Sequence, residues 1–215
     1  QTGLGQDLVP SLVWAEAPAD VPTNWSAVVA GVDQLCGVSD GGLYCWGCTH
    51  EAGGLGTGVH SDCAEESPVQ HLPEKTWTGV RTDPSSDRTC AVTADGGLWC
   101  WGGVKFNSGE GAELLGLGVQ PTYEEPQQVM AGTKWLEVST GGRHTCALDN
   151  GGQVWCWGGN ATGLALPGAP GEGPDYVIEP TLLGSVGGAF GIAAGPYTTS
   201  VLNSEGELTC WGESC

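Results

Sequence analysis

The sequence predicts an all-β protein of four β-propeller-like blades, each of about four short antiparallel strands, in a single repeat domain spanning residues 1–215. Three observations support this prediction. A segment ending in Trp-Gly recurs four times, an aromatic-led strand precedes each copy, and 38 of the 215 residues are glycine while charged residues are few. Short strands joined by tight turns have this composition, and a repeat of about 50 residues is typical of propeller blades.

The recurring segment keeps its spacing along the whole chain. Its copies read CGVSDGGLYCWG, CAVTADGGLWCWG, CALDNGGQVWCWG and SVLNSEGELTCWG. Their tryptophans recur at intervals of 55, 56 and 54 residues, at Trp46, Trp101, Trp157 and Trp211. A period this regular indicates that each copy occupies the same place in a repeated unit, so we expect these tryptophans to lie in the core.

Two further segments complete each unit. An aromatic residue opens a short strand at Trp25, Trp77, Trp135 and Phe190, and a proline-led apolar segment begins further upstream at Pro10, Pro68, Pro126 and Pro180. We expect one unit to be a proline-led edge strand, an aromatic-led strand and a two-stranded hairpin. This predicts blades at about 8–58, 67–118, 125–166 and 179–215, with insertion loops at 48–66, 103–122 and 160–178.

Hairpin register explains six of the ten cysteines. Asp40-Gly41 has the composition of a two-residue type I′ turn, and the next two hairpins fit three-residue loops that contain glycine. These turns place three cysteine pairs directly opposite each other: Cys36 and Cys45, Cys90 and Cys100, and Cys146 and Cys156. Opposed strand residues lie ~4.5–5.5 Å apart, a separation that a disulfide bridges, so three cross-strand disulfides are predicted.

The fourth hairpin places Ser200 opposite Cys210, so we expect Cys210 to pair with Cys215. The remaining pair, Cys48 and Cys63, would staple a loop insertion. An alternative stays open there, because Cys48, His50, His60 and Cys63 could supply two sulfurs and two nitrogens to zinc. Their spacing is not that of a standard zinc finger, and an oxidising compartment favours the disulfide; no metal or other cofactor is predicted.

The cysteine content favours an oxidising compartment and hence a secreted, extracellular protein. Two N-glycosylation sequons, at Asn24 and Asn160, agree with a glycoprotein. The first residue, Gln1, suits a mature, processed end. Pro167 and Pro170 lie in a Pro- and Gly-rich loop where hydroxylation and glycosylation are an open alternative to a plain insertion.

Charge and hydropathy exclude two classes of partner. The formal net charge of −19 repels phosphate backbones and anionic membrane surfaces, so nucleic acid is not an expected partner. No apolar run approaches the ~20 residues of a membrane span, so no membrane insertion is expected. The acidic segments 62–67 and 123–126 lack the spacing of a calcium loop, and we expect them to be solvated loops.

Residues 141–168, GGRHTCALDNGGQVWCWGGNATGLALPG, resemble a repeat of the regulator-of-chromosome-condensation family. The matching positions are Gly141, His144, Thr145, Ala147, Leu148, Gly151, Trp157, Gly158, Asn160 and Gly163. The resemblance implies four-stranded propeller blades and a structural histidine that hydrogen-bonds between blades. That histidine is present only at His144, with counterparts near Gln34, Arg88 and Tyr197.

The resemblance also bears on assembly. Members of the family commonly close a ring of about seven repeats, whereas this chain has four. We expect an incomplete arc completed by another chain, or else a tight small propeller, with exposed edges at LVPSLVW and ELTCWG. The nucleotide-exchange activity of the family is not expected here, because it belongs to a reducing compartment, and the acidic charge argues against chromatin binding.

The predicted function is an extracellular structural or adhesive glycoprotein that self-assembles through its blade edges into an oligomer or filament. The alternative is a secreted propeller or inhibitor that binds a protein or glycan partner with one face. A metal-dependent enzyme is the third hypothesis. The sequence has no nucleophile elbow and no His-Glu-x-x-His motif, so no catalytic residue is predicted and the chain is not expected to be an enzyme.

Overall fold

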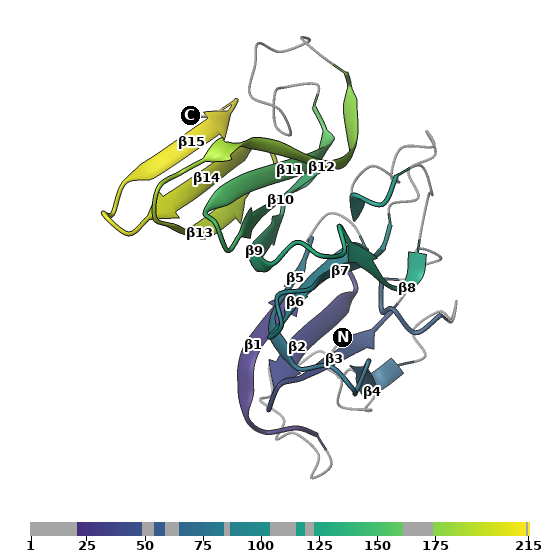
Figure 1. Cartoon of the computed structure of the whole chain (residues 1–215). Coiled ribbons are helices and arrows are strands. Elements are labelled where there is room, and N and C mark those ends of the chain that lie inside the picture. The colour runs from purple at the N-terminus through teal and green to yellow at the C-terminus, as the bar shows by residue number, and fades with distance from the viewer. Residues whose placement is uncertain are drawn as a thin grey trace, which may run out of the picture.

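The computed structural model describes residues 21–48, 54–58, 65–83, 87–103, 115–118, 123–160, 174–213 and 215. These residues form four small antiparallel sheets that follow one another around an open arc (Figure 1). The predicted fold class, an all-β propeller of four blades, is confirmed.

Each sheet is a meander in which consecutive strands are neighbours. The first contains β1 (Trp25–Ala30), β2 (Gln34–Ser39), β3 (Gly42–Gly47) and β4 (Glu65–His71). The second contains β5 (Trp77–Thr82), β6 (Thr89–Thr93), β7 (Leu98–Gly102) and β8 (Tyr123–Val129). The third contains β9 (Trp135–Thr140), β10 (His144–Asp149), β11 (Gln153–Gly159) and β12 (Tyr176–Ser185). The fourth contains β13 (Ala189–Ala194), β14 (Thr198–Asn203) and β15 (Leu208–Gly212).

The predicted blade boundaries are wrong by one strand. The proline-led segments form β4, β8 and β12, and each pairs with the hairpin that precedes it in the sequence, not with the blade that follows. The reason is that each hairpin leaves a free outer edge, which the next segment of chain covers before it crosses to the neighbouring blade. The strands of the first blade therefore run from 25 to 71, and Pro10 lies ahead of that blade, outside the described residues.

The hairpin register follows the turns as the sequence predicts. Asp40 and Gly41 both have positive φ angles, 49° and 78°, as a type I′ turn requires. Cys36 accordingly lies opposite Cys45 in the ladder of β2 and β3. In the next two hairpins the glycine at the end of the loop takes the left-handed conformation, at Gly96 and Gly152.

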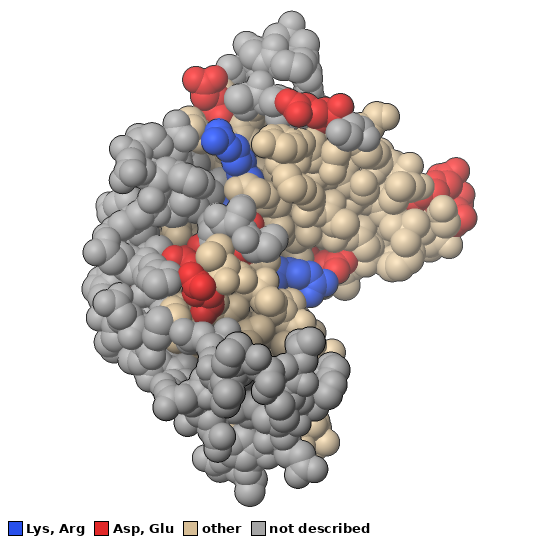
Figure 2. All heavy atoms as spheres, turned by 180° about the vertical axis from the view of Figure 1, so that it is seen from behind, with Lys and Arg blue, Asp and Glu red and all other residues tan. Residues whose placement is uncertain are grey.

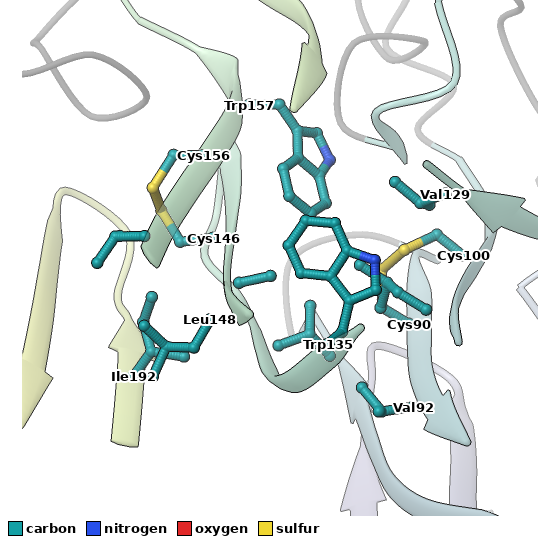
Figure 3. Packing of buried hydrophobic residues seen from close by; sticks show 14 of the residues in the cluster. Cys90, Val92, Cys100, Val129, Trp135, Cys146, Leu148, Cys156, Trp157 and Ile192 are labelled. Carbon is teal, nitrogen blue, oxygen red and sulfur yellow. A yellow bond between two sulfur atoms is a disulfide. The ribbon is translucent and has the colours of Figure 1, made fainter. Parts of the chain in front are cut away.

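The core lies between successive blades and within each hairpin. Trp101 and Trp157 are fully buried, Trp46 is 8% exposed, and only Trp211, in the last blade, is partly exposed. Figure 3 shows Trp135 and Trp157 pointing toward each other, with ring centroids 6.5 Å apart. The repeated tryptophans are thus core residues, as predicted, and the last blade covers its tryptophan least.

Contacts between blades run in chain order. The innermost strand of each blade packs against the blade before it: β5 contacts β1, β2 and β3, β9 contacts β5 and β6, and β13 contacts β9 and β10. The first and fourth blades lie at opposite ends of the arc (Figure 1).

Candidate functional site

Disulfides staple the hairpin of each of the first three blades. The Cα–Cα distances are 4.1 Å for Cys36–Cys45, 4.2 Å for Cys90–Cys100 and 4.1 Å for Cys146–Cys156. All six cysteines are buried. The fourth hairpin has Ser200 opposite Cys210, and Cys210 instead pairs with Cys215 at 5.8 Å.

One of the two cysteines of the possible zinc set, Cys48, forms a disulfide. Cys48 is buried and disulfide-bonded, so its sulfur is not free to ligate a metal. Its predicted partner Cys63, and the two histidines His50 and His60, lie outside the described residues. Across the part of the chain that the structure describes, no group of three or more His, Cys, Asp or Glu side chains is placed to hold a metal ion.

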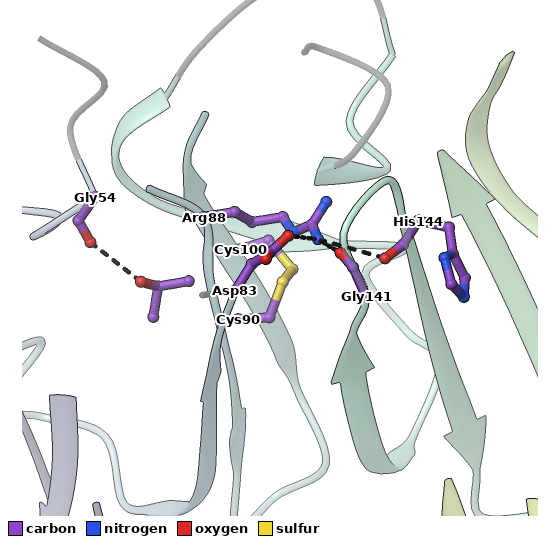
Figure 4. Close-up of a disulfide and its surroundings, with 8 residues drawn as sticks. Gly54, Asp83, Arg88, Cys90, Cys100, Gly141 and His144 are labelled. Carbon is purple, nitrogen blue, oxygen red and sulfur yellow. Dashed lines mark hydrogen bonds and ion pairs between the residues drawn. A yellow bond between two sulfur atoms is a disulfide. The ribbon is translucent and has the colours of Figure 1, made fainter. Parts of the chain in front are cut away.

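Polar side chains at equivalent positions join each blade to the next, and we call Gln34, Arg88 and His144 the interblade girdle. Gln34 Nε2 donates to Thr89 Oγ1 at 3.0 Å, from the first blade to the second. Arg88 donates to the carbonyl of Gly141 in the third blade (Figure 4). His144 Nε2 lies 2.5 Å from Thr199 Oγ1 in the fourth blade, within hydrogen-bonding distance.

The position in the fourth blade that is equivalent to the girdle residues is Thr198 rather than Tyr197. Thr198 lies opposite Gly212, as Gln34 lies opposite Gly47 and His144 opposite Gly158. The predicted counterpart is therefore one residue off in the fourth blade. Tyr197 is itself 54% exposed.

Burial sets the charges within the girdle. Burial, helped by the nearby charge of Arg88 and opposed by Asp83, lowers the pKa of His144 to about 4. Burial also lowers the pKa of Arg88 to about 10, against the attraction of Asp83. At neutral pH the imidazole is therefore neutral and the guanidinium charged, in a fully buried ion pair with Asp83 at 2.7 Å. The resemblance implies a structural interblade role for His144, and this geometry fits that role.

A leucine-glycine segment between the third and fourth strands of each of the first two blades covers the tryptophan of the next blade. Trp101 Nε1 donates to the carbonyl of Gly54 at 2.9 Å, and the neighbouring Leu55 is fully buried. A Cβ on Gly56 would lie 2.6 Å from that same indole nitrogen, so glycine is required there. Gly116 approaches Trp157 in the same way. The sequence alone predicts no role for these segments, although Leu-Gly recurs after both hairpins.

Trp46 occupies the same position in the first blade, but no described residue makes this contact with it. It is 8% exposed, and its Nε1 is buried without a hydrogen-bond partner among the described residues. Trp25 is its aromatic neighbour, with ring centroids 5.6 Å apart, and Trp25 in turn lies 5.7 Å from Tyr44 between centroids. We call this part of the first blade, around Trp25 and Trp46, its leading side; Trp46 is buried there within the single chain.

The fourth blade has an open edge. Among the described residues it has three strands, and no strand pairs with the outer side of β15. Leu208, on β15, is 67% exposed, whereas the residues at its position in the other three blades are buried. Those residues are Leu43, Leu98 and Val154. An unpaired edge with an exposed leucine is a template for another strand.

The innermost strands β1, β5, β9 and β13 line a groove of about 410 Å³. The second residue of each strand faces this groove. In β1 and β5 it is Ser26 and Thr78, whose hydroxyls donate to the carbonyls of Val38 and Val92 in their own blades. At the same position, Leu136 and Phe190 have no such group to donate, and they are 48% and 54% exposed. The groove therefore becomes more apolar toward the fourth blade.

An ion pair crosses the groove between the second and third blades. Arg81 donates to Glu137 at 2.9 Å, with both side chains partly exposed. On the face shown in Figure 2, acidic side chains are spread among uncharged areas, and the described residues form no basic stripe there.

The two predicted glycosylation sites differ in exposure. Asn24 is exposed, and its amide donates to the carboxylate of Asp40 at 3.1 and 3.2 Å. Asn160 is 2% exposed, and its amide donates to the carbonyl of Pro174 at 3.1 Å. A glycan on Asn160 would displace that buried contact, so the geometry favours Asn24; glycosylation itself stays a prediction.

Other predicted positions are placed differently or not at all. Glu124 and Glu125 lie in β8, and Glu65 begins β4, so these acidic residues belong to strands and not to solvated loops as expected. Pro167 and Pro170 lie outside the described residues. In the described parts of the chain, no helix has the length and apolarity needed to span a membrane.

Comparison with known proteins identifies the repeat. Residues 135–163 match the family described as Regulator of chromosome condensation (RCC1) repeat. Regulator of chromosome condensation from Mus musculus is 30% identical over 164 residues, covering 74% of this chain and 36% of that protein. RCC1 domain-containing protein RUG3, mitochondrial, from Arabidopsis thaliana is 30% identical over 193 residues, covering 86% of this chain and 41% of that protein.

Solved structures share the fold. Human WBSCR16 superposes with a TM-score of 0.73 at 20% identity, covering 98% of this chain and 55% of that one. Prp20p from Saccharomyces cerevisiae superposes with a TM-score of 0.70 at 18% identity, covering 88% and 44%. The chain spans from 33% to 41% of the length of the curated relatives first matched. The chain is thus a propeller built from regulator-of-chromosome-condensation repeats.

Proposed function

We propose that this chain is a protein-binding propeller segment of an extracellular protein, which works without catalysis and associates through the open edges of its blades. The observation that carries the proposal is the edge of β15, unpaired among the described residues, with Leu208 67% exposed. Strand addition at such an edge gains main-chain hydrogen bonds and side-chain burial together. In its fuller form, the proposal is a structural or adhesive glycoprotein that forms oligomers or filaments.

The disulfides support the extracellular part of the proposal. Three blades each bury one cross-strand disulfide, and such bonds persist in oxidising compartments. Relatives support protein binding: the structure of yeast Prp20p is described with its binding to Gsp1p and histones, and another with Kap60 bound. The net charge of −19 here favours partners with basic surfaces.

The test is the assembly state of the purified, oxidised chain, measured by light scattering and electron imaging. We expect discrete oligomers or filaments. Leu208→Lys places a charge on the open edge and should shift the population to monomers. Leu182→Lys is the matched control, because Leu182 is also an exposed leucine, at 44%, but lies on β12 of the third blade and not on β15 or the first blade. A chain that is monomeric in all three forms would overturn edge-mediated association.

A second candidate function rests on the inner-strand groove. Leu136 and Phe190 expose apolar surface beside the Arg81–Glu137 pair, which suits a protein or glycan partner that stacks on an aromatic ring. Phe190→Ala should then abolish binding of that partner while leaving the assembly state unchanged. Loss of assembly with unchanged partner binding would argue against the groove as the binding surface.

A further inference from the structure

We propose that the inner-strand groove binds a neutral saccharide, with Phe190 stacked on one face of a sugar ring and the Arg81–Glu137 pair bonding to the hydroxyls at its edge. This inference rests on the groove as the binding surface of the second candidate function, and it names the ligand. The groove holds about 410 Å³, which lies within the roughly 300–1,000 Å³ of small-molecule sites. A stable protein partner would instead cover about 800 Å² of each surface.

Two glycines leave the space beside Glu137 open. Gly79 on β5 and Gly191 on β13 occupy the same register position in their blades as Glu137 on β9. A Cβ on Gly79, which lines the groove, would meet nothing within 4 Å. A Cβ on Gly191 would meet only atoms at ordinary contact distance, the nearest 3.7 Å away. A larger side chain at either position therefore has room, and it would cover Glu137.

Neither the backbone nor the packing requires these glycines. Gly79 and Gly191 are not among the glycines with positive φ angles. The same bulged position holds Ala27 in the first blade and Glu137 in the third, so side chains are accepted there. Glycine inside a strand lowers stability, and it often marks a place where a ligand approaches the backbone closely. The two glycines thus point to a ligand beside Glu137.

The ion pair in the groove is held in place by the protein itself. Arg81 donates to the carbonyl of Val80 and to Glu137 Oε1, each at 2.9 Å. Glu137 Oε2 accepts from the backbone N–H of Ile192 at 3.1 Å. A guanidinium has five N–H donors and a carboxylate has about four acceptor sites, so both groups retain capacity for a ligand. Their side chains are 38% and 27% exposed, which leaves that capacity within reach.

The charges of the groove select a neutral ligand. Arg81 and Glu137 are the charged side chains among the described residues that line the groove, and they compensate each other. A charged ligand would find no uncompensated partner there. An apolar side chain of a protein partner would cover both groups without offering them hydrogen bonds, which is costly. Hydroxyl groups both donate and accept, so a neutral polyhydroxyl ligand satisfies both members of the pair.

Phe190 makes a saccharide the best fit among such ligands. Its ring is 54% exposed and lines the groove. The C–H face of a sugar ring packs on the electron-rich face of an aromatic ring, while the hydroxyls extend from the sugar's edge. Toward the first two blades, Ser26 and Thr78 donate their hydroxyl protons within their own blades, so their oxygens still accept hydrogen bonds. The groove therefore offers an apolar platform at one end and acceptors at the other.

The test uses the full, oxidised chain. Labelled protein is applied to a printed array of neutral hexose and N-acetylhexosamine oligosaccharides, with sialylated and sulfated saccharides alongside. The neutral saccharide that binds best is then titrated by calorimetry. We expect neutral saccharides to bind, and Phe190→Ala to weaken that binding at least tenfold. No binding to any neutral saccharide, or binding to the anionic ones alone, would overturn the inference.

A groove-filling variant locates the site. Gly79→Leu places a side chain in the groove, so we expect it to weaken binding at least tenfold. Gly187→Leu is the matched control, because a Cβ there also meets nothing within 4 Å but the residue lies between β12 and β13, outside the groove lining. It should bind within twofold of the parent chain.

Urea unfolding of the same samples shows that each variant is folded. If Gly79→Leu does not fold, the exposed Phe190→Ala still decides the question. Parental affinity in a folded Gly79→Leu chain or in Phe190→Ala would place the saccharide elsewhere and refute this site.

Failure of this inference is distinguishable from failure of the proposed function. Light scattering on the same samples reports assembly, and calorimetry reports saccharide binding. A chain that assembles but binds no neutral saccharide retains edge association and loses the saccharide. A monomeric chain whose saccharide binding depends on Phe190 does the reverse. A protein partner that binds the parent chain but not Gly79→Leu, with no saccharide bound, would keep the groove as a binding surface and overturn the saccharide as its ligand.

Discussion

The indole Nε1 of Trp101 donates a 2.9 Å hydrogen bond to the carbonyl oxygen of Gly54, and this bond ties the second blade to the segment between β3 and β4 of the first. Thr89 Oγ1 donates to the same oxygen at 3.2 Å. One loop carbonyl thus receives two donors from the next blade. The equivalent Trp46 Nε1 of the first blade has no such partner among the described residues.

Trp101→Phe should therefore destabilise the chain more than Trp46→Phe. Both changes remove an indole N–H from a buried ring, but among the described residues only Trp101 loses a hydrogen bond, worth about 1 kcal/mol, and the Gly54 oxygen keeps its donor Thr89. The free energy of unfolding in urea measures the difference. Equal losses for the two variants would show that the bond to Gly54 contributes nothing.

The buried ion pair of Arg88 and Asp83 predicts a strong effect of removing one partner. Arg88→Met leaves the Asp83 carboxylate buried without its guanidinium and should cost about 3–5 kcal/mol. Arg81→Met is the matched control, because its pair with Glu137 is partly exposed and is worth about 0–1 kcal/mol. Unfolding midpoints compare the two, and a double Arg88→Met/Asp83→Asn chain should recover part of the loss.

Local turn chemistry made much of this fold predictable. Positive φ angles at Asp40 and Gly41 come from a two-residue turn that the sequence specifies, and that turn alone sets Cys36 opposite Cys45. The period of the tryptophans likewise predicts their burial. These features depend on residues close together in the chain, where propensity and register act without tertiary information.

Assignments between blades were harder to predict. The segment at Pro68 reads as an edge strand from its sequence, but nothing local tells which of two neighbouring blades it joins. Arg88 looks like a surface residue until the fold places it against Gly141 and Asp83. Contacts of this kind are set by packing between distant segments, and so they appear only in the structure.

Two buried histidines predict a loss of stability in mild acid. Burial lowers the pKa of both His71 and His144 from 6.5 to about 4. The unfolded chain therefore gains protons below pH 6.5 that the folded chain does not bind. Stability is complete above that pH and falls as the pH drops toward 4, by about 2 kcal/mol for each histidine between pH 7.5 and 5.

His144→Gln isolates one of these contributions. Glutamine does not titrate, and Gln34 already serves as a girdle residue in the first blade. Urea unfolding at pH 7.5 and at pH 5 should show a pH-dependent loss smaller by about 2 kcal/mol in the variant than in the parent chain. An unchanged difference between the two pH values would mean that His144 is protonated in the folded chain.

Two strand glycines make opposite predictions for substitution by alanine. A Cβ on Gly37 would lie 2.7 Å from two ring carbons of Trp25 and 2.8 Å from the carbonyl oxygen of Ala27, so the ring or the backbone of β1 must move. Overpacking of this kind costs about 1–3 kcal/mol. A Cβ on Gly79, in β5, would meet nothing within 4 Å, so Gly79→Ala should change the free energy of unfolding by at most about 0.5 kcal/mol.

Urea midpoints at a constant m-value compare the variants, and near-ultraviolet circular dichroism reports the environment of the aromatic rings, which should change only in Gly37→Ala. If Gly37→Ala were as stable as the parent, Trp25 would have room to shift, and its packing against Trp46 would not be what holds the leading side of the first blade.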